Sequence, residues 1–296
     1  MTKSLAEVTK QFVHYLSSAI VIFAFQANAS NVLSDTVPEN RLHQKLSFRG
    51  IPLNDDYQSQ GNAPYRVGIY SDNGVWDLGL EHFKLFLQEH HVSYVSLKHA
   101  DILAGALNRG NITTLIVPGG ASWEYLKDLG SAGASEISTF VANGGGYIGI
   151  CAGAFYATSL REGGYATGPY GIGLLEGTAY DGTALETKPF KEGMLDFDVQ
   201  IEGLKNSFKI ALLGGPSFLF TDSEAEKKHI QVWGWFQVVH QPAMIAFENG
   251  RGHVFLSAPH IEVEEGRAGW GPEWADPESD WPILEKALSF VDKSNY

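Results

Sequence analysis

The chain has one cysteine, Cys151, and the residues around it indicate a nucleophile. It lies in the segment GGYIGICAGAFYA, with Gly149 and Gly153 two positions to either side. A nucleophile on the sharp turn between a strand and a helix tolerates little bulk at these two positions, and the pattern G-x-C-x-G meets that requirement. A helix beginning at Ala152 would direct free N–H groups at the sulfur and favour the thiolate. The alternative is a small buried side chain in a tight turn.

A thiolate needs a proton-transferring partner, and His260 is the best candidate among ten histidines. It follows an apolar run in VFLSAPHIEVEE, so a strand parallel to the one before Cys151 would bring it to the same sheet edge. Glu262, two residues on, can orient the imidazole from the same side of an extended segment. Six of the other histidines are weaker candidates: His82, His90 and His91 are expected on a surface helix, and His99, His229 and His253 have no carboxylate at this spacing.

Amide hydrolysis through a thiolate also requires donors for a developing oxyanion. The amide of Ala152 would face it, and Gly119 and Gly120, at the end of a neighbouring strand, could add a second donor because glycine allows close backbone approach. These two glycines could equally only terminate the strand. The sequence has no metal-binding spacing, no dinucleotide fingerprint and no P-loop, so we predict neither a metal nor a cofactor.

Strands and helices alternate in the part of the chain that carries these residues. Strands are predicted at 65–70, 92–97, 113–120 and 147–150, with helices at 78–91, 99–110 and 136–146. This order predicts an α/β fold with a doubly wound, mostly parallel, flavodoxin-like sheet, whose active site lies at the carboxyl ends of the strands. A β-rich insertion follows residue 160, then a strand at 229–237, a hairpin at 243–258 and a helix at 280–293. We expect one domain over residues 65–296.

Composition limits the partners. The 296 residues are 44% hydrophobic, enough for a substantial core, and the formal net charge is −13. This charge would repel nucleic-acid phosphates and anionic lipid headgroups, so we expect neither as a partner.

The N-terminus has the pattern of a secretory signal peptide at residues 1–29. Lys3 and Lys10 precede the apolar run FVHYLSSAIVIFAF, and Ala27-Asn28-Ala29 suits a cleavage site. We therefore predict an exported protein, periplasmic or secreted, without stable membrane insertion after cleavage, and a polar extension at 30–64. An uncleaved anchor or an amphipathic first helix are the alternatives.

The segments LIVPGGASWEYLKDLG, FVANGGGYIGICAGAFYA and SAPHIEVEE together resemble the class I glutamine amidotransferase-like superfamily. Within it, and with LLGGP at 212–216, the chain is similar to the N-terminal domain of biotin-protein ligases and its free-standing bacterial relatives, over about residues 65–290. The resemblance implies that Cys151 attacks a carboxamide, that His260 transfers the proton and that Glu262 orients His260. It does not reach the separate domain that carries biotin ligation, so a biotinylating activity is not implied.

The sequence thus predicts a cysteine-dependent amide hydrolase that acts on a small-molecule or peptide amide through a thioester, with an unknown acceptor. A first alternative is an exported cysteine peptidase or cell-wall amide hydrolase. A second is a non-catalytic small-molecule-binding module on the same fold.

Overall fold

A computed structural model describes residues 67–109, 111–164, 166–181, 193–264 and 278–292, with Arg267, Gly269, Gly271 and Trp274. The predicted signal peptide, 1–29, and the extension, 30–64, lie outside the described residues. Within the described ranges, no helix has the length and apolar character needed to cross a membrane.

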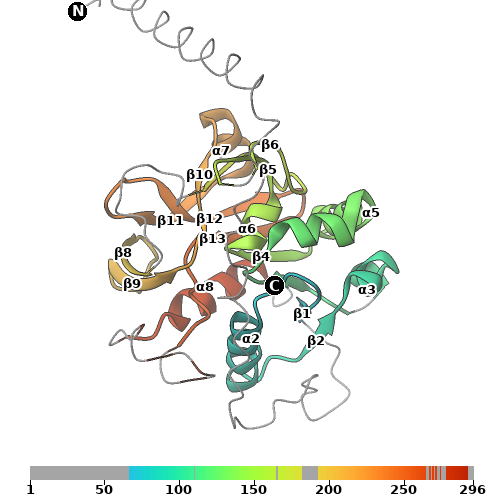
Figure 1. Cartoon of the computed structure of the whole chain (residues 1–296), viewed down its shortest axis with the longest axis horizontal. Coiled ribbons are helices and arrows are strands. Elements are labelled where there is room, and N and C mark those ends of the chain that lie inside the picture. Colours follow the sequence, from blue (N-terminus) through green and yellow to red (C-terminus); the bar gives the residue numbers. More distant parts are fainter. Residues whose placement is uncertain are drawn as a thin grey trace, which may run out of the picture. The chain divides into compact units, whose positions relative to one another are not determined.

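The fold is built on a nine-stranded sheet whose first five strands are parallel (Figure 1). If these five strands are numbered by their order along the chain, they lie in the sheet in the order 2-1-3-4-5, which is the doubly wound arrangement of flavodoxin-like folds. This confirms the predicted α/β fold. In spatial order the five strands are β2 (Tyr94–Leu97), β1 (Val67–Tyr70), β3 (Thr114–Val117), β4 (Gly146–Ile150) and β13 (Gly252–Ser257).

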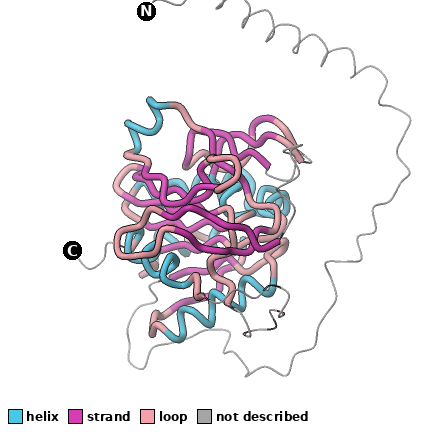
Figure 2. The backbone as a smooth tube through the Cα atoms, turned by 90° about the vertical axis from the view of Figure 1, so that its left-hand side faces the viewer, coloured by secondary structure: helices cyan, strands magenta, loops and turns pink. Residues whose placement is uncertain are grey.

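The same sheet continues in four antiparallel strands, and a smaller sheet packs beside it (Figure 2). The antiparallel strands are β12 (Pro242–Asn249), β11 (Gln231–Phe236), β8 (Gly193–Val199) and β9 (Ser207–Leu212). The four-stranded sheet contains β10 (Pro216–Leu219), β7 (Leu175–Asp181), β5 (Thr158–Glu162) and β6 (Gly168–Pro169). The β-rich stretch expected after residue 160 therefore both extends the main sheet and forms a second one.

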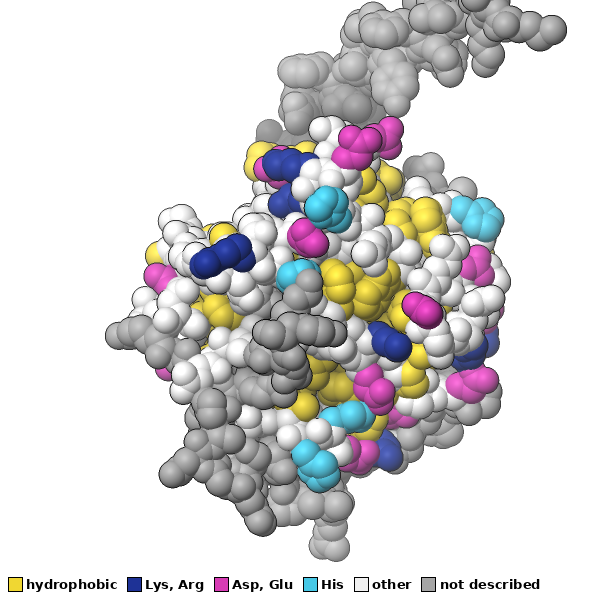
Figure 3. Space-filling model, turned by 180° about the vertical axis from the view of Figure 1, so that it is seen from behind, with side chains coloured by type: hydrophobic (Ala, Val, Ile, Leu, Met, Phe, Trp, Pro, Cys, Tyr) yellow, Lys and Arg dark blue, Asp and Glu magenta, His cyan; other side chains and the backbone are white. Residues whose placement is uncertain are grey.

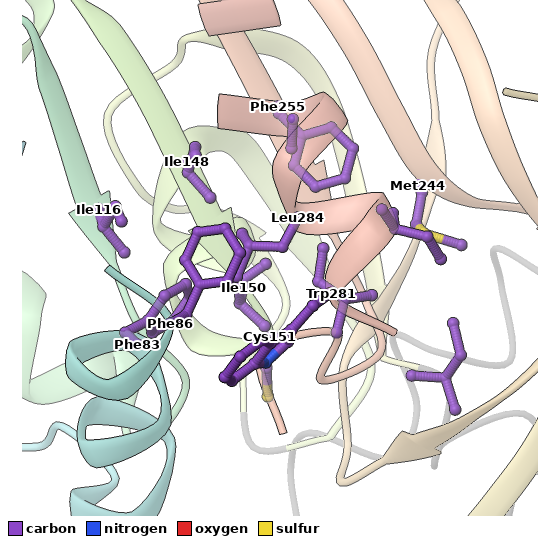
Figure 4. Packing of buried hydrophobic residues seen from close by; sticks show 14 of the residues in the cluster. Phe83, Phe86, Ile116, Ile148, Ile150, Cys151, Met244, Phe255, Trp281 and Leu284 are labelled. Atoms are coloured by element: carbon purple, nitrogen blue, oxygen red, sulfur yellow. The ribbon is translucent and has the colours of Figure 1, made fainter. Parts of the chain in front are cut away.

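Helices cover both faces of the main sheet. On one face, α2 (Asp77–Glu89) and α8 (Trp281–Val291) bury Phe83, Phe86 and Leu284 against isoleucines of β3 and β4 and against Phe255 of β13 (Figure 4). The opposite core is formed with α3 (His99–Leu103), α4 (Ala106–Arg109), α5 (Ser122–Ala142) and α6 (Ala152–Ala157). A short helix, α7 (Asp222–Lys228), is capped by Thr221, whose hydroxyl accepts a hydrogen bond from the Glu224 amide.

Two helices differ from the sequence prediction, and glycine is the reason in each case. Helix α5 begins 14 residues before the predicted start at 136, because the chain stays helical on both sides of a kink at Gly130, where φ is 54° and ψ is −160°. The helix predicted at 99–110 is divided into α3 and α4 at Gly105, whose φ is 80°. Apolar periodicity did not reveal either change because glycine interrupts the pattern without always ending the helix.

The strands that deliver the candidate site are central and completely buried. Every residue of β4 and of β13 is buried, as expected for parallel strands covered on both faces. The two strands are parallel neighbours, with Ser257 opposite Ile150. Because these are the last residues of their strands, the segments that follow, Cys151 and the turn that holds His260, leave the sheet at the same edge.

Candidate active site

Cys151 occupies a strained turn between β4 and α6. Its φ of 49° and ψ of −105° are unusual for a residue with a side chain, and such strain costs about 1–3 kcal/mol. A Cβ on Gly149 would meet the Gly153 carbonyl oxygen at 2.7 Å, and a Cβ on Gly153 would lie within 1.9 Å of the Val117 carbonyl oxygen. Both glycines of the G-x-C-x-G pattern are therefore required by the backbone.

His260 and Glu262 form a buried pair at the same sheet edge. His260 Nδ1 lies 2.8 Å from Glu262 Oε1, and the two residues are 1% and 0% exposed. Burial opposes a charge on the ring, but the Glu262 carboxylate, followed by the Cys151 sulfur, outweighs it and raises the pKa of His260 to about 10. The Glu262 carboxylate and the Cys151 sulfur therefore both favour the protonated imidazole of His260.

A turn, not the expected extended segment, brings the two side chains together. The Val263 amide donates to the His260 carbonyl at 3.3 Å, and the His260 amide donates to the Ala211 carbonyl at 2.8 Å. The indole N–H of Trp281 donates to the Glu262 carbonyl at 2.9 Å. The side chains of His260 and Glu262 still meet, as predicted, because these bonds hold both ends of the turn.

The His260 imidazole is confined by its neighbours. The Trp76 ring packs edge-on against it, with ring centroids 4.8 Å apart. A Cβ on Gly119 would lie 2.5 Å from His260 Cε1 and 3.4 Å from Cys151 Cβ. Gly119 thus touches both members of the predicted Cys-His pair, and no other residue type fits there while the imidazole stays in place.

The structure shows which of the predicted oxyanion donors have a free backbone amide. In the first turn of α6, the Gly153 amide donates to the Pro118 carbonyl at 3.1 Å and the Ala154 amide to the Cys151 carbonyl at 3.1 Å. Of the several free amides expected there, only that of Ala152 remains, because the first residue of a helix has no partner within it. Gly120, with φ of 139°, pairs with Val75 in an isolated antiparallel bridge, which fixes the Gly119–Gly120 loop next to Cys151.

The LLGGP element covers the sulfur. Cys151 Sγ lies 3.6 Å from the Leu213 carbonyl oxygen, and the cysteine is 6% exposed. A Cβ on Gly215 would lie 2.0 Å from the Ala258 carbonyl oxygen, so this segment packs tightly against the end of β13.

His82 is the buried residue that the sequence analysis misplaced. We expected it on a surface helix, but it is 0% exposed, and its Nδ1 accepts a hydrogen bond from the Glu264 amide at 3.0 Å. Burial lowers the pKa of His82 to about 4, against the opposing charge of Glu262. Helix α2 carries apolar residues on both sides of His82, namely Leu80 and Phe83, and this signal could have indicated its burial.

Other histidines also have acidic partners, although not at the i, i+2 spacing of His260 and Glu262. His99 Nδ1 lies 2.6 Å from Asp72, and His229 Nδ1 lies 2.9 Å from Glu248. These partners are distant in sequence, so spacing could not reveal them. Unlike the His260–Glu262 pair, both contacts are partly or largely exposed.

Charged groups elsewhere include a second buried ion pair, between Arg161 and Asp181 in the smaller sheet. Among the residues that the structure describes, no group of three or more His, Cys, Asp or Glu side chains could hold a metal ion. On the face seen in Figure 3, acidic and basic side chains are interspersed, with apolar side chains between them. The described part of this face has no single area in which basic side chains gather.

Comparison with a solved structure defines the class of fold. A crystal structure of a glutamine amidotransferase superimposes on 76% of this chain and 97% of its own length, with a TM-score of 0.52 and 20% sequence identity. At this identity the match shows the fold alone. The protein has the class I glutamine amidotransferase-like fold, with Cys151 at the strand-to-helix turn.

Sequence comparisons define the family. Residues 65–271 match the family described as the N-terminal part of biotin-protein ligase, and the chain belongs to this family. An uncharacterized protein of Chlamydia muridarum is 27% identical over 215 residues, which cover 67% of this chain and 80% of the relative. The biotin–protein ligase of Schizosaccharomyces pombe is 23% identical over 161 residues, which cover 50% of this chain and 25% of the ligase. The chain thus matches only a quarter of that ligase.

Proposed function

We propose that the protein is a cysteine-dependent amide hydrolase that uses Cys151, His260 and Glu262. The observation that carries the proposal is the buried His260–Glu262 pair, 2.8 Å apart, at the sheet edge where Cys151 sits in a strained turn. An ion pair enclosed in this way has no evident role in packing, since burying charged groups is costly. An imidazolium beside a sulfur favours the thiolate, which is the nucleophilic form.

The proposed reaction runs through a thioester. The Cys151 thiolate attacks the amide carbonyl carbon, and the carbonyl electron pair moves to oxygen to give a tetrahedral oxyanion. As this collapses, the C–N bond breaks and His260 gives its proton to the departing ammonia or amine. Water then attacks the thioester while His260 takes a proton from it. The acid leaves, and the Cys151 thiolate and protonated His260 are restored.

Ammonia release tests the proposal most directly. The full chain is incubated with glutamine and with short peptides that carry a terminal carboxamide, and Cys151→Ala is the matched control. Hydroxylamine converts an acyl-thioester to a hydroxamate, which mass spectrometry detects. We expect turnover that disappears in Cys151→Ala and falls at least a hundredfold in His260→Ala. Equal ammonia release from the wild type and Cys151→Ala would refute the hydrolase.

The contact between Cys151 and Leu213 supports a second candidate, a binding module without catalysis. Cys151 is 6% exposed and its sulfur faces the Leu213 carbonyl at 3.6 Å, so a substrate has little access to the sulfur in this conformation. Ligand-induced thermal stabilisation without turnover would favour this function. Cleavage of internal peptide bonds in a peptide library, without ammonia release, would instead favour a cysteine peptidase.

A further inference from the structure

The hydroxyl of Tyr125 lies beside the backbone of the predicted oxyanion loop. It donates toward the Gly119 carbonyl oxygen at 3.0 Å and also lies 3.2 Å from that of Pro118. The Gly74 carbonyl oxygen lies 3.5 Å away, so one hydroxyl proton is shared among three acceptors, of which Gly119 is the nearest. Tyr125 comes from α5 and is 0% exposed.

The other bonds to the loop act on the same carbonyls. The Gly119 carbonyl also accepts from the Trp76 amide at 2.9 Å, and the Pro118 carbonyl accepts from the Gly153 amide at 3.1 Å. No peptide bond among the described residues is cis, so each amide in this loop points opposite to the carbonyl of its own peptide unit. Because the carbonyls of Pro118 and Gly119 are both held on the Tyr125 side, the amides of Gly119 and Gly120 point away from Tyr125.

The bridge between Val75 and Gly120 leaves the Gly120 amide unused. Its two hydrogen bonds run from the Trp76 amide to the Gly119 carbonyl and from the Ala121 amide to the Gly74 carbonyl. Gly119, which precedes that amide, lies against both Cys151 Cβ and the His260 ring. The amide therefore belongs to a loop that borders the sulfur.

The Tyr125 ring is locked in position. It packs edge-on against Tyr70, with centroids 5.2 Å apart, and against Tyr156, with centroids 6.1 Å apart. A hydroxyl on a ring held in this way has little freedom, so it can fix the orientation of the Gly119 carbonyl.

We propose that Tyr125 is a positioning residue for acylation of Cys151: its hydroxyl holds the Gly119 carbonyl so that the Gly120 amide is directed to the developing oxyanion. This rests on the proposed function, because an oxyanion forms only if Cys151 attacks a carbonyl group. Tyr125 itself touches no reacting atom. Removing its hydroxyl should slow carbonyl attack by the sulfur and leave other reactions of the sulfur unchanged.

Two reagents separate these effects. p-Nitrophenyl acetate acylates a thiolate through a tetrahedral oxyanion: the C–S bond forms, the bond to the aryl oxygen breaks, and p-nitrophenolate leaves with the electron pair. Iodoacetamide alkylates the same thiolate by direct displacement of iodide, and no oxyanion develops. The ratio of the two rate constants reports oxyanion stabilisation, whereas general damage to the site lowers both.

The experiment compares the full chain with Tyr125→Phe and with Tyr156→Phe as the matched control. Both variants keep a buried ring, but the Tyr156 hydroxyl has no hydrogen-bond partner among the described residues. We expect Tyr125→Phe to be acylated about tenfold more slowly and alkylated at the wild-type rate. Tyr156→Phe should match the wild type with both reagents.

Three results would overturn the inference, and they are distinguishable. If the wild type is acylated no faster than Cys151→Ala, the proposed function fails and the role of Tyr125 fails with it. If the wild type is acylated and Tyr125→Phe reacts equally fast, only the positioning role fails. An equal loss of acylation and alkylation in Tyr125→Phe would show that Tyr125 is structural.

Discussion

Two buried histidines should make the stability of the protein depend on pH in opposite directions. The contribution of His82 is lost as the pH falls, and that of His260 is lost as the pH rises. Burial lowers the pKa of His82 from 6.5 to about 4, whereas the pKa of His260 rises from 6.5 to about 10, because the Glu262 carboxylate and the Cys151 sulfur outweigh the effect of burial. Below pH 6.5 the unfolded chain takes up a proton at His82 that the folded chain does not. The stability due to neutral His82 is therefore complete above pH 6.5 and is lost as the pH falls to 4.

The pKa shift of His82 corresponds to a change of about 3 kcal/mol in the free energy of unfolding, at about 1.36 kcal/mol for each pKa unit. The contribution of His260 has the opposite sign: it is complete below pH 6.5 and is lost as the pH rises toward 10. The two windows meet near pH 6.5 and do not overlap. A measurement between pH 4 and 6.5 therefore reports His82 while the contribution of His260 stays constant.

Urea unfolding followed by tryptophan fluorescence measures this effect at several pH values from 4 to 8. The variant His82→Asn does not titrate in this range, and its side-chain oxygen can replace Nδ1 as acceptor for the Glu264 amide. We expect the advantage of the wild type over the variant to shrink by about 3 kcal/mol from pH 7 to pH 4. His91→Asn, at an exposed position in the following turn, is the control. Parallel curves for the wild type and His82→Asn would refute the assignment of a buried neutral His82.

Two further predictions concern packing around the site and the second sheet. Gly119→Ala places a Cβ 2.5 Å from His260 Cε1, so the ring must move and acylation of Cys151 by p-nitrophenyl acetate should fall about a hundredfold; a wild-type rate would show that the ring yields freely. Asp181→Asn breaks a buried ion pair, 2.7 Å long, with Arg161, and should lower the free energy of unfolding by about 3 kcal/mol in urea titrations. Asp196→Asn, in an exposed pair, should cost less than 1 kcal/mol, and an equal loss in both variants would contradict this reasoning.

The sequence predicted the parts of the site that depend on short motifs. Cys151 is marked by glycines at fixed spacing, and His260 by the end of an apolar strand with Glu262 two residues on. These features can be read locally, and the parallel order of the strands then follows from the alternation of strands and helices. The structure places the residues as this reasoning expected, although a turn replaces the extended segment between His260 and Glu262.

Contacts between distant segments could not be predicted from the sequence. Tyr125 lies in the half of α5 that the glycines at 130 and 133 concealed, so its register relative to Gly119 could not be deduced. Leu213 reaches Cys151 from 62 residues away, through the end of an antiparallel strand that apolar periodicity did not identify. His82 was expected on a surface helix, whereas the side chains packed around it bury it completely.

The candidate site is held from both faces of the sheet, and this division explains why distant side chains matter to it. Cys151 belongs to the core shared with α2 and α8, whereas Ala152, the next residue, belongs to the core shared with α5 and α6. The His260–Glu262 pair is fixed from the first face, where Trp281 bonds the Glu262 backbone. The Gly119–Gly120 loop is fixed from the second face, where Tyr125 bonds Gly119. In the proposed reaction, nucleophile activation and oxyanion stabilisation therefore depend on separate cores, and we expect substitutions in one core to change one of them without the other.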